Sequence, residues 1–202
     1  MSDRDLILGR IREALTPLKQ RSPLPQWDRE LTICRAQPDT PDLKAQFAHR
    51  LRAVHGTLLE NPADLADLLQ KENATSGYCD PALRHHFDSP AFEGIAFHDH
   101  FDVSDYEQYQ FGITRASAAV AESGTIILKD TETASRLAAL SPWIHIAVVN
   151  ERDLIADLPT AIDGLGDDPN VVWATGPSKT ADVEGILIEG VHGPGVQAVL
   201  FA

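Results

Sequence analysis

Cysteine, basic residues and long apolar runs are all scarce in this 202-residue chain. Its two cysteines, Cys34 and Cys79, lie far apart and form no CxxC pair, so cysteine ligands cannot build an iron–sulfur cluster or a structural zinc site. The 17 lysine and arginine residues are outnumbered by 30 aspartate and glutamate residues, which gives a net charge of −13. A field of that sign repels a phosphate backbone and argues against nucleic-acid binding.

No apolar run approaches the roughly 20 residues that span a bilayer. The segment at residues 1–5 is acidic and polar, which is not the pattern of a signal peptide. We therefore expect no membrane span and a cytoplasmic location, where the reducing conditions suit a chain with few cysteines.

The composition is otherwise ordinary for a globular protein, with 43% hydrophobic and 23% charged residues. Apolar residues at helical spacing predict an amphipathic helix over residues 3–18. Four prolines then interrupt residues 20–42, which predicts an extended arm. We expect residues 1–42 to be an appendage that packs on its own domain or on a second subunit, and residues 43–202 to form one domain.

Predicted strands and helices alternate through residues 43–202. This alternation implies βαβ units and a largely parallel sheet with helices on both faces. The predicted strands are 56–59, 76–80, 94–97, 111–114, 124–128, 144–149, 171–175, 186–188 and 197–201; the predicted helices are 42–55, a segment beginning at Asn61-Pro62, 81–87, 116–121, 133–140 and 152–158.

Two glycine-rich polar loops follow predicted strands near the C-terminus. The first contains Gly176, Ser178, Lys179 and Thr180, and the second, residues 190–195, contains His192 and Gly193. Loops at the carboxyl ends of strands commonly build ligand sites in open α/β sheets. We expect the two loops to meet and to form a pocket for a carboxylate, a phosphate or a CoA-like anion.

Each group in these loops has an expected role. Ser178 or Thr180 is expected to start a short helix that runs through Asp182 and Glu184, and the free amides at its start would hold the anion. Lys179 would neutralise the anion, and His192 would supply a hydrogen bond or a proton. The alternative is that these loops merely connect strands, with Lys179 paired to Asp182 or Glu184 at the surface. The spacing of a Walker A loop is absent, so ATP hydrolysis is not supported.

A third candidate stretch, residues 121–125, precedes a predicted buried strand. Glu122 could act there as a base or a nucleophile, beside Ser123, Gly124 and Thr125. The alternative interpretation makes Glu122 a solvated turn residue or a helix-cap partner.

The segment from residue 98 to residue 102 contains two histidines and two aspartates that could coordinate a metal. His98 and His100 would share one face of a strand. Zinc motifs carry a third ligand at a defined spacing, and none is evident here, so we predict no metal site.

Three motifs resemble the signature of the lactate-utilization (LUD) family, and in particular its small C-type (LutC/YkgG-like) members. They are AESGT at residues 121–125, TGPSKTADVEG at residues 175–185 and GVHGPG at residues 190–195. Their order and spacing match from about Phe111 to the C-terminus, whereas the part before Gln110 matches only in general shape.

The resemblance implies a three-layer α/β/α fold with a mixed, largely parallel sheet, related to the NagB/RpiA/CoA transferase group. It also implies a role in oxidising L-lactate to pyruvate together with iron–sulfur proteins from the same operon. Because the chain lacks the cluster cysteines of the longer B-type relatives, we expect the iron–sulfur clusters in those partners and no cofactor in this chain. Association into homo-oligomers is left open. The alternative is a stand-alone CoA-transferase-like or phosphosugar-type enzyme that uses Glu122.

Overall fold

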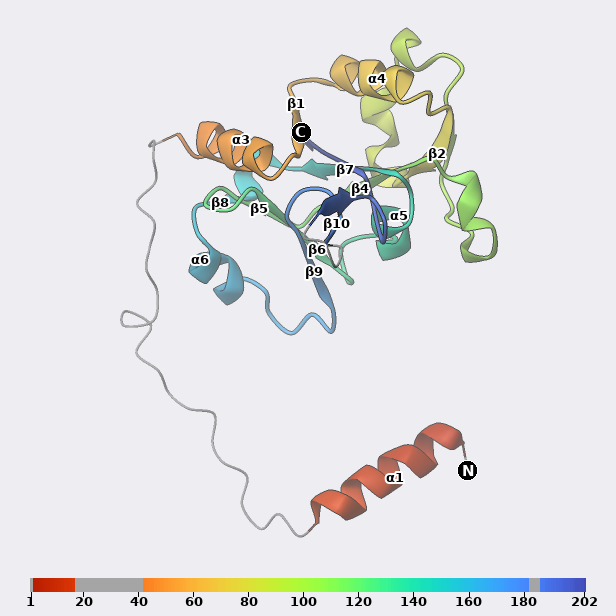
Figure 1. Ribbon diagram of the computed structural model, residues 1–202, viewed down its shortest axis with the longest axis vertical. Helices are drawn as coiled ribbons and strands as arrows, with labels where there is room; N and C mark the ends of the chain where they lie inside the picture. Colours follow the sequence, from red (N-terminus) through yellow and green to blue (C-terminus); the bar gives the residue numbers. More distant parts are fainter. Residues whose placement is uncertain (1, 17–41, 182–185) are drawn as a thin grey trace. The chain divides into compact units, whose positions relative to one another are not determined.

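The computed structural model describes residues 2–16, 42–181 and 186–202 and divides the chain into two units, Met1–Cys34 and Arg35–Ala202 (Figure 1). In the first unit, α1 (Asp3–Leu15) begins with a capping box, in which Ser2 and Asp5 each bond the other's backbone amide. No side chain of α1 is buried. The predicted helix is therefore confirmed up to Leu15, and most of the predicted arm lies outside the described residues.

A six-stranded parallel sheet forms the centre of the second unit. Its strands are, in spatial order, β1 (Thr57–Leu59), β12 (Val196–Phe201), β7 (Ile144–Val149), β4 (Phe111–Arg115), β2 (Ser76–Cys79) and β3 (Ala96–His98). The three central strands are almost entirely buried, which explains why their sequences are nearly continuous apolar runs.

Helices cover both faces of this sheet, as Figure 1 shows for α4 on one side and α5 on the other. The first face packs on α4 (Pro62–Lys71) and on two 3-10 helices, η1 (Pro81–Phe87) and η2 (Pro90–Phe92). The second face packs on α3 (Leu43–Ala53) and α5 (Arg136–Leu140). The remaining 3-10 helices are η3 (Val103–Gln108) and η4 (Glu151–Asp153).

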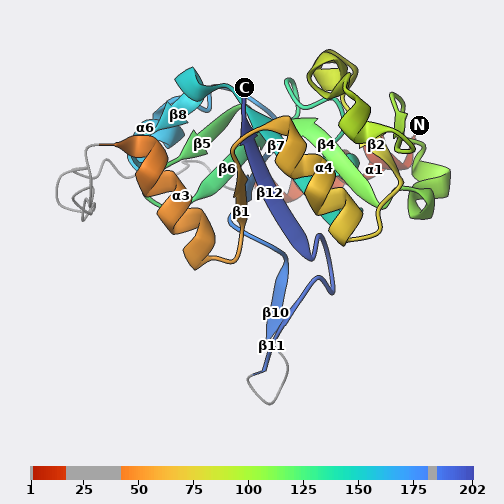
Figure 2. The ribbon, with the colours of Figure 1, turned by 90° about the horizontal axis from the view of Figure 1, so that it is seen from above.

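A second sheet of four strands packs on the same face as α3. Its order is β8 (Leu154–Ile155), β5 (Ala118–Val120), β6 (Thr125–Lys129) and β9 (Val171–Ala174), and α6 (Leu158–Asp163) packs against β5 and β8. After β9, an antiparallel pair, β10 (Lys179–Ala181) and β11 (Leu187–Glu189), projects from the body of the unit (Figure 2).

The predicted three-layer α/β fold is confirmed, with its antiparallel pairs confined to the second sheet and the hairpin. Two predicted helices are wrong. The small residues of 116–121 form the buried strand β5, because small apolar side chains also suit a strand packed between two layers. Of residues 152–158, the first two belong to η4 and the next two to β8, and α6 begins at Leu158. Among the described residues, no helix is long and apolar enough to cross a membrane.

Candidate functional site

The two glycine-rich loops meet, as the sequence predicts. The Ser178 amide donates to the Pro194 carbonyl over 2.9 Å, and the Gly190 amide donates to the Ser178 carbonyl over 2.8 Å. Beside this junction lies a cavity of about 420 Å³. Its lining includes Gly176, Ser178, Lys179, His192 and Gly193 from the predicted site, together with apolar walls from β6, α5 and β9 and two polar residues of the central sheet, His145 and Gln197.

The strand order explains which residues reach the floor of this cavity. The loop after β9 forms one side of the cavity, whereas His145 and Gln197 are the second residues of β7 and β12 and lie directly opposite each other in register. The cavity thus lies at the carboxyl end of one strand and the amino ends of two others.

A buried hydrogen-bond chain runs across three central strands under the cavity. His145 Nε2 lies 2.9 Å from Thr114 Oγ1, and His145 Nδ1 lies 3.1 Å from Gln197 Oε1. Gln197 Nε2 donates to the carbonyl of Ala198. Since the Gln197 oxygen can only accept, His145 carries its proton on Nδ1 and accepts from the Thr114 hydroxyl through Nε2.

The imidazole of His145 is neutral at physiological pH. Burial lowers its pKa to about 4, an effect only partly offset by the hydrogen bond to Gln197. All three members of the chain are at most 3% exposed. A polar row among apolar neighbours costs stability unless every group is paired, so its presence under a cavity marks this part of the sheet as a candidate site.

Two glycines lie where the loops approach their surroundings closely. Gly176 has a φ of 74°, and a Cβ there would lie 2.2 Å from the Val54 carbonyl oxygen at the end of α3. At Gly195, a Cβ would lie 2.1 Å from the ring of Trp143. A larger residue at Gly176 would push its loop away from α3, whereas one at Gly195 would displace the half-exposed ring of Trp143.

Lys179 is engaged at the base of the hairpin. Its ammonium donates to the Val54 carbonyl over 3.0 Å and lies 3.5 Å from Glu189, which also pairs with His55 over 2.7 Å. The pKa of Glu189 is lowered by the hydrogen bonds and charges of these two partners, against the opposing effect of burial. The charge of Lys179 is therefore already compensated by Glu189. This arrangement argues against the expectation that Lys179 neutralises an anion in the pocket.

The expected helix start at Ser178–Thr180 is wrong. Lys179 and Thr180 belong to β10, whose backbone pairs with β11, and the Ser178 amide is used by Pro194. The expected members Asp182 and Glu184 lie outside the described residues. The stretch is thus part of a strand pair and does not begin a helix, so no free helix amides are available there to hold an anion.

Glu122 lies outside the cavity lining. Its carboxylate accepts the amide of Leu158, the first residue of α6, over 3.0 Å. An acidic side chain at that position satisfies a free helix amide and interacts favourably with the helix dipole. Of the two interpretations that the sequence left open, the geometry favours the helix-cap partner over the nucleophile.

Residues Ser123, Gly124 and Thr125 are connected to the cavity indirectly. The hydroxyls of Ser123, Thr125 and Thr175 form a chain with two distances of 2.7 Å, and Thr175 lines the cavity. Gly124 packs against the backbone of α3. The first motif thus supports the end of β9 and does not contribute directly to the cavity wall.

The segment with two histidines and two aspartates is used for local structure. His98 bonds the Ser76 hydroxyl, the His100 carbonyl accepts from the Tyr109 hydroxyl, and Asp102 caps η3. Within the described parts of the chain, no three histidine, cysteine, aspartate or glutamate side chains are grouped as metal ligands.

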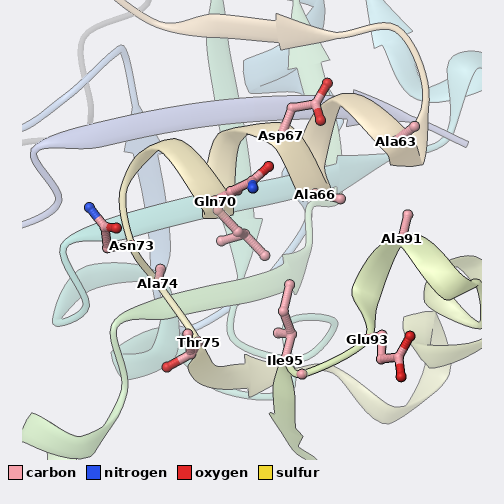
Figure 3. Close-up of a pocket in the computed structure, with 12 residues that line it drawn as sticks. Ala63, Ala66, Asp67, Gln70, Asn73, Ala74, Thr75, Ala91, Glu93 and Ile95 are labelled. Atoms are coloured by element: carbon pink, nitrogen blue, oxygen red, sulfur yellow. The ribbon is translucent and has the colours of Figure 1, made fainter.

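A separate crevice of about 460 Å³ lies between α4 and the segment from Ala91 to Ile95 (Figure 3). Leu69, Ile95 and small residues form its apolar surface, and Asp67 and Glu93 are its charged residues. With two carboxylates and no cation in its described lining, this crevice disfavours a negatively charged ligand. It contains none of the predicted site residues.

Sequence reasoning missed Thr114, His145 and Gln197. A signal was present, because each is a polar residue inside an otherwise apolar strand, as in Ile144-His145-Ile146. Such a residue faces the opposite side of the sheet from its two neighbours. What the sequence did not indicate is that the three side chains are adjacent.

Comparisons with known proteins agree with this architecture. The LUD domain matches residues 90–201, more than half of the chain. A solved structure described as a DUF162 family protein from Deinococcus radiodurans aligns with a TM-score of 0.57 and 19% identity, over 79% of this chain and 96% of that one. This likeness supports the fold.

Two curated relatives are both named lactate utilization protein C. The one from Bacillus subtilis is 32% identical over 52% of this chain and 48% of its own length. The one from Anoxybacillus flavithermus is 27% identical over 84% of this chain and 85% of its own length. The chain spans about half the length of several such relatives. From the match to residues 90–201, the chain belongs to the LUD domain family.

Proposed function

We propose that this chain is a component of a cytoplasmic L-lactate utilization system. Unlike its partner proteins, this component contains no iron–sulfur cluster. In this proposal it acts with iron–sulfur proteins of the same operon in the oxidation of L-lactate to pyruvate. The name shared by its relatives supports the pathway. The reaction removes two electrons and two protons from lactate, and the electrons pass to the clusters of the partner proteins.

The share of this chain is to bind a small anionic metabolite, with L-lactate and pyruvate as the first candidates. The observation that carries this proposal is the cavity of about 420 Å³ that the second and third motifs line together with β6, α5, β9 and the central sheet. Ser178 and His192 offer hydrogen-bonding groups in its wall. Its described lining contains no carboxylate, in contrast to the crevice beside α4.

Growth of a deletion strain tests the pathway. Loss of the gene should abolish growth on L-lactate but not on pyruvate, and the wild-type gene should restore it. A Ser178→Phe variant, which fills the cavity, should fail to restore growth while remaining folded. Gln70→Phe, in the crevice beside α4, is the matched control and should restore it. Normal growth of the deletion strain on L-lactate would refute the proposal.

The need for partners has its own test. The purified chain alone should show no iron–sulfur absorbance and no oxidation of L-lactate with an artificial electron acceptor, because no cluster-binding cysteine pattern is present. A tagged chain should retain iron–sulfur proteins from lactate-grown cells. Rapid turnover by the isolated chain would contradict a role that depends on partners.

A further inference from the structure

The floor and the mouth of the cavity differ in the charge that they can accept. The floor contains His145 and Gln197, which are 1% and 3% exposed. The mouth contains His192, which is exposed, and Ser178, which is partly buried. A ligand that enters must therefore place one end in a dry, neutral environment and the other near water.

A carboxylate at the floor would be uncompensated. The fixed cation in the described lining is Lys179, and its ammonium is held by the Val54 carbonyl and Glu189. The imidazole of His145 is neutral, and its nitrogens already bond Thr114 and Gln197. Burying an unpaired charge costs far more than burying a neutral group that can be hydrogen-bonded.

A neutral oxygen, by contrast, has a partner at the floor. The carboxamide of Gln197 has two N–H groups, of which one donates to the Ala198 carbonyl. Among the described residues, the second N–H has no protein acceptor, and the residue lines the cavity. Because Gln197 Oε1 is occupied by His145, the amide cannot turn over without breaking that bond.

We propose that the cavity selects small 2-hydroxy or 2-oxo carboxylates, with the oxygen on C2 bound at the floor by Gln197 and the carboxylate directed outward to Ser178 and His192. This inference rests on the proposed function, since it assigns the ligand class and orientation within the same site. His145 is a positioning residue, because its Nδ1–H fixes the orientation of the Gln197 amide. The hydroxyl of Thr114 in turn holds the imidazole.

A ligand series on the purified full chain tests the selection. Isothermal titration should detect sodium L-lactate and sodium pyruvate. Propionate, which lacks the C2 oxygen, should bind about tenfold more weakly, the effect of one lost hydrogen bond to a buried group. Malonate, which places a second carboxylate inward, should bind more weakly still.

Two variants test the contributions of the floor and of the mouth to binding separately. Gln197→Met should remove the preference for lactate over propionate, whereas Ser178→Ala should weaken both by the same factor. Glu93→Gln, in the crevice beside α4, is the control and should change neither. If Gln197→Met does not unfold cooperatively, the ligand series on the wild-type chain decides the question.

The outcomes distinguish the two proposals. If propionate displaces lactate and binds as tightly, the selection by the floor is refuted, while an anion-binding cavity stands. If none of the four acids binds, the proposed ligand site and its selectivity are both refuted.

Discussion

Mild acidification should destabilise the folded chain through His145. The folded state keeps this imidazole neutral, with its pKa lowered from 6.5 to about 4 by burial, whereas the unfolded chain takes up a proton below pH 6.5. The unfolded state therefore binds more protons between these values, so stability is complete above pH 6.5 and falls as the pH drops toward 4. A shift of that size corresponds to about 3 kcal/mol in full, and about 2 kcal/mol is lost between pH 7 and pH 5.

Urea unfolding at several pH values measures this loss. The wild-type chain should lose about 2 kcal/mol more between pH 7 and pH 5 than His145→Gln, which cannot titrate, whatever the absolute stability of the variant. His49 is exposed, so His49→Gln is the matched control and should keep the wild-type slope. Equal slopes for the wild-type chain and His145→Gln would refute the assignment of a buried, neutral imidazole.

Four further outcomes follow from individual contacts. Gly176→Ala should cost about 2 kcal/mol or more by urea unfolding, because its φ is 74° and its Cβ would meet the backbone carbonyl oxygen of Val54 at 2.2 Å. Glu122→Ala should cost about 1 kcal/mol and still support growth on lactate; lost growth at unchanged stability would instead favour a catalytic role. Thr125→Val should cost about 1–3 kcal/mol by breaking the hydroxyl chain, and Thr125→Ser should cost less. In a Cys34→Ser variant, which keeps Cys79 as its only cysteine, the folded chain should resist a thiol reagent at pH 8 and react once unfolded, since burial raises the pKa of the Cys79 thiol to about 12; fast reaction of the folded variant would contradict the burial of Cys79.

The sequence predicted most strands because alternating apolar residues, or a continuous apolar run, indicate a strand from the local sequence alone. The strands at Ile144–Val149 and Val196–Phe201 agree with their predicted positions within a residue. It failed at Ala118–Val120 because three small apolar residues suit a helix and a buried strand equally well. Packing between two layers decided that case.

The sequence predicted that the two glycine-rich loops meet, but not how their donors are used. The meeting of the two glycine loops was foreseen, and Ser178, His192 and Gly193 line the cavity. The expected anion site at the amides depended on a helix start, and the expected role of Lys179 depended on an ammonium without other partners. The carbonyls of Pro194 and Val54 use those donors instead, and no local pattern reveals an acceptor that lies far away along the chain.

The sequence by itself determined the class of fold and the position of the glycine turns, because both arise from local periodicity and backbone freedom. Only the tertiary structure decided the floor of the cavity. Thr114, His145 and Gln197 come from strands separated by about 30 and 50 residues along the chain, and the order β4-β7-β12 makes them neighbours. Strand order is a property of the whole sheet, so no single strand encodes the contact between these side chains.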